Sequence, residues 1–428
     1  MSLHLDEAAR SILETNDLGG YTIPTKGLYP YQWNWDSAFV SLGFARFSLE
    51  RAWQEIETLM EGQWPDGMVP HILFRKDDPS YFPGPSVWGT HGKPMPSSGH
   101  SQPPVAATAV RHIYELDKSP AARERLKVLF RKLLKWHRWF HTARDPQGLG
   151  VIAVMHPWES GRDNLPDWDE PTKQIDTSSV GTYQRKDTSH VDPTMRPKKA
   201  DYDRYLALVQ FGREHNWDPY AIATNCPFFV ADPAMTFILL RADRDLLALA
   251  KELGEDEAAT ELEEWIARTE SGISILWNED LQAFTVFDLR SGTKGDGISS
   301  ASFLAPYAGI SNPQYIEPML AHFDRIASQV TYMMPSYDPD HEAFEPMRYW
   351  RGPVWGILNY MIAKGLGEIG EDSRAARMRD DTAALIAKSG FAEYFNPFTG
   401  DGAGGSSFSW TSAIWLDWVT PTRTAGEA

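Results

Sequence analysis

The sequence predicts an all-α protein built as an (α/α)6 barrel, and three observations lead to that prediction. Helical periodicity of apolar residues recurs about a dozen times along the 428 residues. Strand patterns are scarce. Three long segments rich in Trp, His, Gly and Pro interrupt the helices, at 64–102, 156–201 and 396–407. A ring of paired helices with elaborated loops on one face fits this pattern. A solenoid of helical repeats is the alternative, but no consensus recurs between the helices.

The expected helices follow one another in chain order. They span 5–14, 35–47, 49–63, 104–116, 121–142, 202–214, 227–241, 243–254, 255–277, 314–328, 350–365, 373–389 and 409–416. The range 255–277 shows the periodicity clearly, because apolar residues including Leu262 and Ile266 share one face with acids opposite. Asp372 and Ser373 are typical of a helix start, and Gly390 of a helix end. We expect one strand at 283–288, paired in a hairpin with 291–293.

Composition and charge exclude several classes of function. The net charge is −17 and Lys and Arg form no stripe, so we expect no nucleic-acid partner. No apolar run reaches the ~20 residues of a membrane span. No signal-peptide pattern is visible at the N-terminus, and we expect a cytoplasmic protein that contacts no membrane. Cys226 is the only cysteine, and its apolar neighbours predict a buried small side chain.

The same composition bounds the domains and the ligands. We expect one catalytic barrel domain over 1–428, in which the loops 64–102 and 156–201 form a lid. No His/Cys cluster and no acidic loop with calcium spacing occur, so we expect neither a metal nor a cofactor. The oligomeric state stays open, a homo-oligomer included. The 17 Trp residues exceed what core packing needs, and carbohydrate sites use indoles to stack on sugar C–H faces.

The segment 156–164, His-Pro-Trp-Glu-Ser-Gly-Arg-Asp-Asn, carries the densest chemistry. It combines two carboxylates with a guanidinium, a hydroxyl, an amide and an indole. A site that cleaves a sugar needs that mixture, because proton transfer needs acids and a pyranose needs aromatic and polar contacts. We expect Glu159 to pair with Arg162 and to stabilise the turn. Asp163 is then the candidate catalytic acid.

Two segments nearer the N-terminus predict a sugar subsite. In 29–36, Trp33, Trp35 and Asp36 surround a helix start, where the acid can grip hydroxyl groups and the indoles can stack. The alternative is an acid favoured by the helix dipole beside core rings. In 62–71, Asp66 belongs to a turn and is expected to be structural. For His71 a functional and a structural role weigh evenly. Gln102, just before a helix that begins with proline, can face the same cavity.

Three later segments add candidates. Arg196, near Tyr202, can bind a carboxylate in bidentate fashion, although an ordinary surface arginine is the alternative. The segment 348–355 brings two indoles, Trp350 and Trp355, to a helix start. Glu393 lies just past a helix end, where the helix dipole does not favour an acid. We therefore choose it as the second carboxylate.

Seven motifs in order resemble glycoside hydrolase family 63, in its short bacterial branch of mannosylglycerate and glucosylglycerate hydrolases. They are Tyr-Pro-x-x-Trp-x-Trp-Asp (29–36), Gly-Met-Val-Pro-His (67–71), Tyr-Phe-Pro-Gly-Pro (81–85), Gln-Pro-Pro (102–104), Trp-Glu-Ser-Gly-x-Asp-Asn (158–164), Tyr-Trp-Arg-Gly-Pro-x-Trp (349–355) and Glu-Tyr-Phe-x-Pro-x-Thr-Gly (393–400). The resemblance covers nearly the whole chain. Trehalases share the Glu-Ser-Gly-x-Asp core, so that motif alone does not fix the substrate.

The resemblance implies an (α/α)6 barrel, an inverting mechanism and a set of roles. Asp163 matches the general acid and Glu393 the general base, and inversion requires their carboxyl groups to be ~6.5–9.5 Å apart. Arg196 and Tyr202 match the residues that hold the glycerate carboxylate. The rest of the expected substrate-binding set is Tyr29, Trp33, Trp35, Asp36, His71, Tyr81, Gln102, Tyr349, Trp350 and Trp355.

We therefore expect an exo-acting α-glycosidase that hydrolyses a small α-glucoside or α-mannoside, with glucosylglycerate or mannosylglycerate as the expected substrate. The choice between glucose and mannose stays open, because it depends on one hydroxyl group. The alternatives are an α-glucosidase or α-mannosidase acting on a neutral disaccharide, and a non-catalytic carbohydrate-binding barrel. An epimerase or isomerase is a further alternative, but such sites use histidine pairs, and no motif here clusters them near the two acids.

Overall fold

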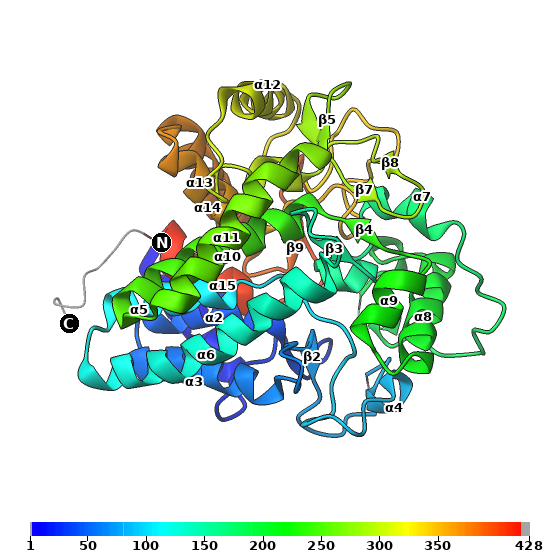
Figure 1. Ribbon diagram of the computed structural model, residues 1–428. Helices are drawn as coiled ribbons and strands as arrows, with labels where there is room; N and C mark the ends of the chain where they lie inside the picture. Colours follow the sequence, from blue (N-terminus) through cyan, green and yellow to red (C-terminus); the bar gives the residue numbers. More distant parts are fainter. Residues whose placement is uncertain (1, 80, 190, 421–428) are drawn as a thin grey trace.

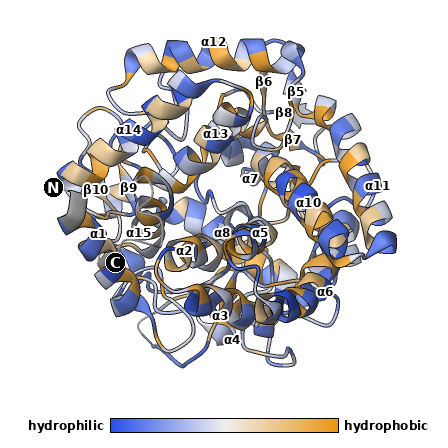
Figure 2. Cartoon of the chain, turned by 90° about the vertical axis from the view of Figure 1, so that its left-hand side faces the viewer, coloured by the Kyte–Doolittle hydropathy of each residue, from blue (hydrophilic) through white to orange (hydrophobic). Residues whose placement is uncertain are grey.

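The computed structural model describes residues 2–79, 81–189 and 191–420. Six helical segments form a closed ring in the middle of the molecule. Met1 and residues 421–428 of the expected domain lie outside the described residues. Each segment of the ring packs on the next, and the last packs on the first (Figure 2). They are α2 (Asn34–Ala45), α5 (Ala106–Leu116), α10 (Pro233–Leu253), the 3-10 segment Ser300–Leu304, α13 (Gly356–Glu368) and α15 (Ser409–Ile414).

A second set of helices surrounds this ring and alternates with it along the chain. Figure 2 shows them at the periphery of the molecule. The alternation confirms the (α/α)6 prediction. The outer helices are α1 (Ser2–Asn16), α3 (Leu49–Leu59), α6 (Pro120–Ala143), α11 (Asp256–Gly272), α12 (Pro313–Gln329) and α14 (Asp372–Ser389).

Burial explains which helices lie inside. Every residue of α2 is buried, as an inner helix requires. In α3 the buried residues follow helical spacing, including Ala52, Ile56 and Leu59, and the opposite face meets solvent. Side-chain caps define the helix starts, because Ser48 and Ser119 each accept a hydrogen bond from a backbone N–H of the first turn.

Three of the expected helices differ clearly in their limits from the observed ones. Residues predicted as two helices, 227–241 and 243–254, form the single helix α10, which begins only after the N-cap Asp232. Asp243, the expected start of the second helix, lies inside α10, and its buried carboxylate contacts two histidines of α6. The helix expected at 350–365 begins at Gly356, since residues 350–352 form a turn and bends and Pro353 follows them. Three short helices were not predicted, α4 (Pro85–Trp88), α7 (Asp169–Thr172) and α9 (Pro219–Asn225).

Short antiparallel strands hold the long loops. β1 (Gln32–Trp33) pairs with β2 (Ile72–Leu73), and β9 (Tyr394–Phe395) pairs with β10 (Gly402–Ala403). A four-stranded sheet runs in the order β3 (Ala153–Val154), β4 (Val230–Ala231), β7 (Phe287–Asp288), β8 (Thr293–Lys294). The hairpin between β7 and β8 confirms the predicted one. The strand expected at 283–288 is divided, however, because β6 (Ala283–Phe284) pairs with β5 (Trp277–Asn278).

The remaining helices gather beside the barrel. In Figure 1, α8 (Lys199–Glu214), α9, α7 and α4 lie together at the right of the view, and α4 packs against α8. Cys226 is buried, as predicted. Within the part of the chain that the structure describes, no helix has both the length and the apolar composition to cross a membrane.

Candidate active site

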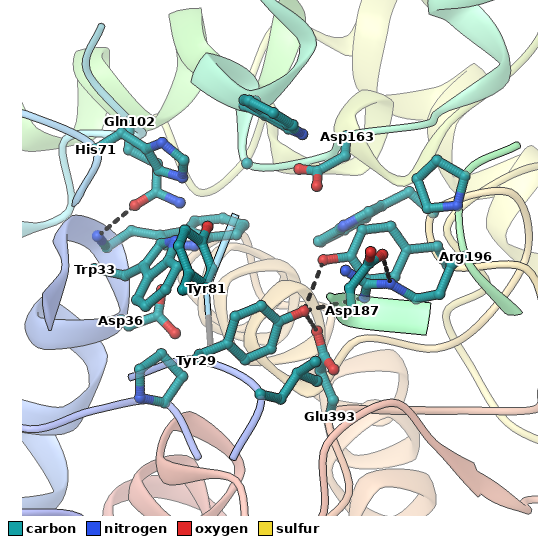
Figure 3. Close-up of a pocket in the computed structure, with 18 of the residues that line it drawn as sticks. Tyr29, Trp33, Asp36, His71, Tyr81, Gln102, Asp163, Asp187, Arg196 and Glu393 are labelled. Atoms are coloured by element: carbon teal, nitrogen blue, oxygen red, sulfur yellow. Dashed lines mark hydrogen bonds and ion pairs between the residues drawn. The ribbon is translucent and has the colours of Figure 1, made fainter. Parts of the chain in front are cut away.

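A cavity opens at the centre of the ring, with about 890 Å³ of empty space including its opening to solvent. Both long loops, 64–102 and 156–201, contribute residues to its wall. All but one of the predicted site residues line it: Tyr29, Trp33, Trp35, Asp36, His71, Tyr81, Gln102, Asp163, Arg196, Tyr202, Tyr349, Trp350 and Glu393 (Figure 3). The exception, Trp355, lies outside the lining. Its lining combines aromatic rings with a few convergent polar and charged side chains, as sites for small molecules do.

The loop that carries Asp163 is tightly held. Gly161 has a φ of +70°, a conformation that favours glycine, and its Cα lies against the indole of Trp35. Ser160 Oγ accepts a hydrogen bond from the backbone N–H of Arg162 at 3.0 Å. The hydroxyl of Tyr205, on α8, donates to the backbone carbonyl of Asp163 at 2.7 Å. The Asp163 carboxyl is left to face the cavity.

Glu159 supports this loop, but the expected pairing with Arg162 is wrong. Its two carboxylate oxygens accept hydrogen bonds from Arg144 at 2.9 and 2.8 Å. They also accept from the backbone N–H groups of Ser101, at 3.1 Å, and Met155, at 2.9 Å. Arg162 turns to Asp232 instead. Its guanidinium is buried there, away from Glu159, because the chain brings the N-cap of α10 beneath the loop.

Glu393 is fixed by backbone and by a phenol. Its Oε2 accepts a hydrogen bond from the Gly405 N–H at 2.8 Å, and its Oε1 accepts one from the Tyr29 hydroxyl at 3.0 Å. Gly404 passes so close that an added Cβ would lie 2.3 Å from Oε2, at a φ of +73°. Glycine is therefore required there for the β9–β10 hairpin to approach the carboxylate.

The two carboxyl groups face the cavity from opposite sides (Figure 3). Burial raises the pKa of Asp163 to about 7, Arg196 opposes that rise, and Glu393 adds to it. Burial also raises the pKa of Glu393, while Arg196 and the hydrogen bonds from Gly405 and Tyr29 lower it. A carboxyl group with a pKa near 7 can hold a proton for donation at neutral pH.

Indoles form the walls around these acids. Trp35 is oriented through its backbone N–H, which donates to Gln102 Oε1 at 3.1 Å. Trp350 lines the cavity, and Trp355 lies behind it with ring centroids 3.8 Å apart and an interplanar angle of 4°. Trp355 therefore supports the wall rather than forming it. Its own N–H donates to the carbonyl of Tyr349 at 3.0 Å.

The remaining polar residues of the predicted sugar subsite lie on the side of the cavity away from Arg196 (Figure 3). Burial raises the pKa of Asp36 well above its ordinary value, and Glu393 contributes. Burial lowers the pKa of His71 well below its usual range, so its ring is neutral at pH 7. That ring stacks on His100, with centroids 4.9 Å apart, and His100 stacks in turn on His156, at 5.1 Å. Three histidines thus stack in a row that begins with His71 in the cavity wall, which the separate motifs did not reveal.

Arg196 and Tyr202 both line the cavity, but their polar groups have different hydrogen-bond partners. Arg196 donates from Nη1 to the Tyr29 hydroxyl at 3.0 Å and from Nε to Asp187 at 3.1 Å. Tyr202 already donates its hydroxyl hydrogen to the carbonyl of Phe82 at 3.2 Å. A carboxylate ligand would therefore meet the guanidinium first.

Sequence reasoning missed several lining residues, of which Asp187 is the most informative. It accepts two hydrogen bonds from Arg185, at 3.0 and 2.6 Å, beside the one from Arg196. Burial alone would raise the pKa of Asp187, but these arginines lower it to about 2. The cluster of three charged residues in Arg185-Lys186-Asp187 was the available signal. Trp158, Trp410 and Lys186 also line the cavity.

Comparisons with known proteins agree over nearly the whole chain. The model of the mannosylglycerate hydrolase MGH1-like glycoside hydrolase domain matches residues 29–411. A mannosylglycerate hydrolase from Thermus thermophilus is 45% identical over 414 residues, which cover 96% of this chain and 99% of that protein. A glucosylglycerate hydrolase from Mycolicibacterium hassiacum is 33% identical over 434 residues, 96% of this chain and 97% of that protein.

A solved structure extends the likeness to the fold. A GH63 mannosylglycerate hydrolase from Thermus thermophilus, in complex with Tris and D-glycerate, matches this chain with a TM-score of 0.94 at 45% identity. The match covers 97% of this chain and 100% of that one.

Proposed function

The chain belongs to the mannosylglycerate hydrolase MGH1-like glycoside hydrolase family, as its motifs predicted, and we propose that it hydrolyses glucosylglycerate or mannosylglycerate with inversion at the anomeric carbon. It is a glycoside hydrolase. The observation that carries the proposal is the pair Asp163 and Glu393, which face one small cavity from opposite sides. In an inverting enzyme one carboxyl group protonates the leaving oxygen and the other activates water on the opposite face of the sugar.

Asp163 acts as the general acid. Its raised pKa, about 7, leaves a large fraction protonated at neutral pH, and Arg196 limits how far the pKa rises. The proton passes to the glycosidic oxygen as the bond to the anomeric carbon breaks. No other described residue forms a hydrogen bond with this carboxyl group, because the loop is held through the backbone carbonyl of Asp163.

Glu393 acts as the general base. The Gly405 N–H and the Tyr29 hydroxyl hold one oxygen each, which fixes the plane of the carboxylate. A water molecule on that side of the sugar gives its proton to Glu393 while its oxygen bonds to the anomeric carbon. The products are a sugar of inverted configuration and free glycerate.

The charged residues at one end of the cavity are the reason why we propose glycerate as the aglycone. Arg196 offers a buried cation, and Lys186 also lines the cavity. The aromatic and amide residues on the other side, among them Trp35, Gln102 and Trp350, suit the pyranose. Two hydrolases similar to this chain act, by their names, on the mannosyl and the glucosyl forms of glycerate. The loops 64–102 and 156–201 close over a substrate of this size and exclude polymers, as a lid over a single barrel domain.

A substrate panel with anomer detection tests the proposal. Purified enzyme receives mannosylglycerate, glucosylglycerate, the corresponding glycosides of glycerol, trehalose and mannobiose. We expect turnover of at least one glycerate glycoside above all neutral compounds. Proton NMR during the first turnovers should show the β-anomer of the sugar released from an α-glycoside. Release of the α-anomer would contradict the roles given to Asp163 and Glu393.

Variants of the two acids complete the test. Asp163→Asn and Glu393→Gln should each lower kcat by about 10²–10⁴, the range typical of general acid–base catalysis. Glu261→Gln is the matched control, since Glu261 lies on the outer helix α11 and pairs with Arg138 at the surface. Unchanged turnover in either acid variant, with the control also unchanged, would falsify the catalytic assignment.

A further inference from the structure

Arg196 connects the aglycone end of the cavity to the catalytic groups. Its Nε donates to Asp187, and its Nη1 donates to the Tyr29 hydroxyl. Its guanidinium carbon lies 4.2 Å from the ring centroid of Tyr349. Among the described residues, Nη2 has no hydrogen-bond partner. The guanidinium is thus held on two edges and over one face, which leaves Nη2 for a ligand.

One hydroxyl separates Arg196 from the proposed base. Tyr29 accepts from Arg196 Nη1 at 3.0 Å and donates to Glu393 Oε1 at the same distance. The Tyr349 hydroxyl lies 3.3 Å from that of Tyr29. An anion that neutralises the charge of Arg196 therefore affects Glu393 through a continuous chain of hydrogen bonds. The chain is buried, where electrostatic effects are strong.

Arg196 also acts on the proposed acid. For both Asp163 and Glu393, burial raises the pKa and Arg196 is the strongest opposing influence. An anion placed on Arg196 cancels much of its positive charge at both carboxyl groups. Asp187 cannot do this fully, because its own charge is shared with Arg185.

We propose that the carboxylate of the substrate, bound at Arg196, sets the catalytic protonation state, so that Asp163 retains its proton at higher pH and Glu393 attracts a proton more strongly. This inference rests on the proposed function, since it takes an anionic aglycone at Arg196. It predicts that the anionic aglycone contributes to kcat and not only to binding. Arg196 is then a residue that determines specificity through the chemical step.

Other ionisable groups face the two carboxyl groups, and they are the same whichever substrate is bound. Their influence is therefore constant in a comparison of matched substrates, and only the substrate's charge differs. They are Asp36, Tyr81, Lys186, Asp187, Tyr205 and Tyr349.

The kinetic test compares an anionic with a neutral aglycone. The pH profiles of kcat and kcat/KM are measured for the better glycerate glycoside and for the matching glycerol glycoside. We expect the alkaline limb of kcat to lie about one pH unit above that of kcat/KM for the glycerate substrate, the size typical of a nearby charge. For the glycerol glycoside the two limbs should coincide. Equal separation of the limbs for both substrates would overturn the inference.

A direct test needs no turnover. The Asp163 carboxyl is followed by ¹³C NMR in the full-length enzyme labelled at aspartate, with Asp163→Asn to assign the signal. Saturating D-glycerate should shift its titration upward by about one pH unit, and glycerol should not. If no glycoside is hydrolysed, the proposed function fails and this titration still decides the inference. Hydrolysis without any glycerate-dependent shift leaves the proposed function standing and overturns the inference.

Charge-removal variants locate the effect. In Arg196→Met the Asp163 titration should already be shifted upward without ligand, and D-glycerate should shift it no further. Arg204→Met is the matched control, because Arg204 lies on the neighbouring helix α8, pairs with Asp201 and does not line the cavity. That variant should keep the full glycerate-dependent shift. Loss of the shift in Arg204→Met to the same extent would contradict a specific role for Arg196.

Discussion

The Cα of Gly161 lies directly against the indole of Trp35, so closely that an added Cβ would stand 2.8 Å from the ring. This contact joins the start of the inner helix α2 to the loop that carries Asp163. It explains why a glycine stands two residues before the proposed acid. The left-handed backbone at Gly161 and the flat wall of Trp35 fit together only when no side chain lies between them.

Gly161→Ala should therefore lower both stability and activity. The positive φ costs about 1–2 kcal/mol for an L-residue, and the clash with Trp35 adds to that cost. Displacement of Asp163 by about 1 Å should lower kcat/KM by about 100-fold. Thermal unfolding and steady-state rates provide the measurements. Gly148→Ala is the control, since Gly148 has a φ of +66° but no atom near an added Cβ. Similar rates in both variants would rule out the role given to the Trp35 contact.

Asp163→Asn should stabilise the folded protein at alkaline pH while it lowers activity. Burial raises the pKa of Asp163 from 3.8 to about 7, so the folded state holds a proton that the unfolded state releases. The contribution of this carboxyl group to the free energy of unfolding is fully present below about pH 4 and is lost as the pH rises to 7. The variant does not ionise and avoids that loss. We expect its Tm to exceed that of the wild type at pH 8 and to match it near pH 4; the reverse order would refute the assigned pKa direction.

Glu159→Gln should lower the free energy of unfolding more than it lowers turnover. The substitution breaks a buried, doubly hydrogen-bonded pair with Arg144 and leaves the guanidinium without a counter-charge. Loss of one partner of a buried pair costs about 3–5 kcal/mol. Urea unfolding should show this loss, whereas Glu393→Gln should change turnover far more than stability. An undiminished midpoint for Glu159→Gln would mean that Arg144 finds another partner.

Asp243→Asn should destabilise the barrel without changing the chemistry. The Asp243 carboxylate accepts from His137 at 2.7 Å and from His141 at 2.9 Å, all three side chains being buried between α6 and α10. Although burial opposes it, the two histidines hold the pKa of Asp243 below its ordinary value. Its stabilisation is therefore present above the pKa of the unfolded chain and is lost as the pH falls.

The measurement for Asp243→Asn is the unfolding free energy at pH 7, with kcat as the second readout. We expect a loss of about 3–5 kcal/mol and an unchanged kcat under conditions where the protein is folded. Glu261→Gln, which breaks the exposed pair with Arg138, should cost at most about 1 kcal/mol. A strong fall in kcat at full folding would connect this cluster to the active site and contradict a structural role.

Local patterns in the chain were enough to predict the ring of paired helices and most of the residues that line the cavity. Helical periodicity depends on neighbours three and four positions away, so α3 or α11 can be read from the chain alone. The motifs around Asp163 and Glu393 are also local. Their catalytic roles remain predictions, as does the carboxylate-binding role of Arg196.

Contacts between side chains that are far apart in the sequence could be identified only from the tertiary structure. Glu159 pairs with Arg144 and not with the nearby Arg162, because the buried carboxylate faces the end of α6. Trp355 stacks behind Trp350, outside the cavity, because the chain turns and bends at 350–352 before it enters α13. Asp187 reaches Arg196 from a loop with no recognisable motif. Such contacts depend on how helices pack against one another, and the spacing of residues along the chain does not encode them in any readable way.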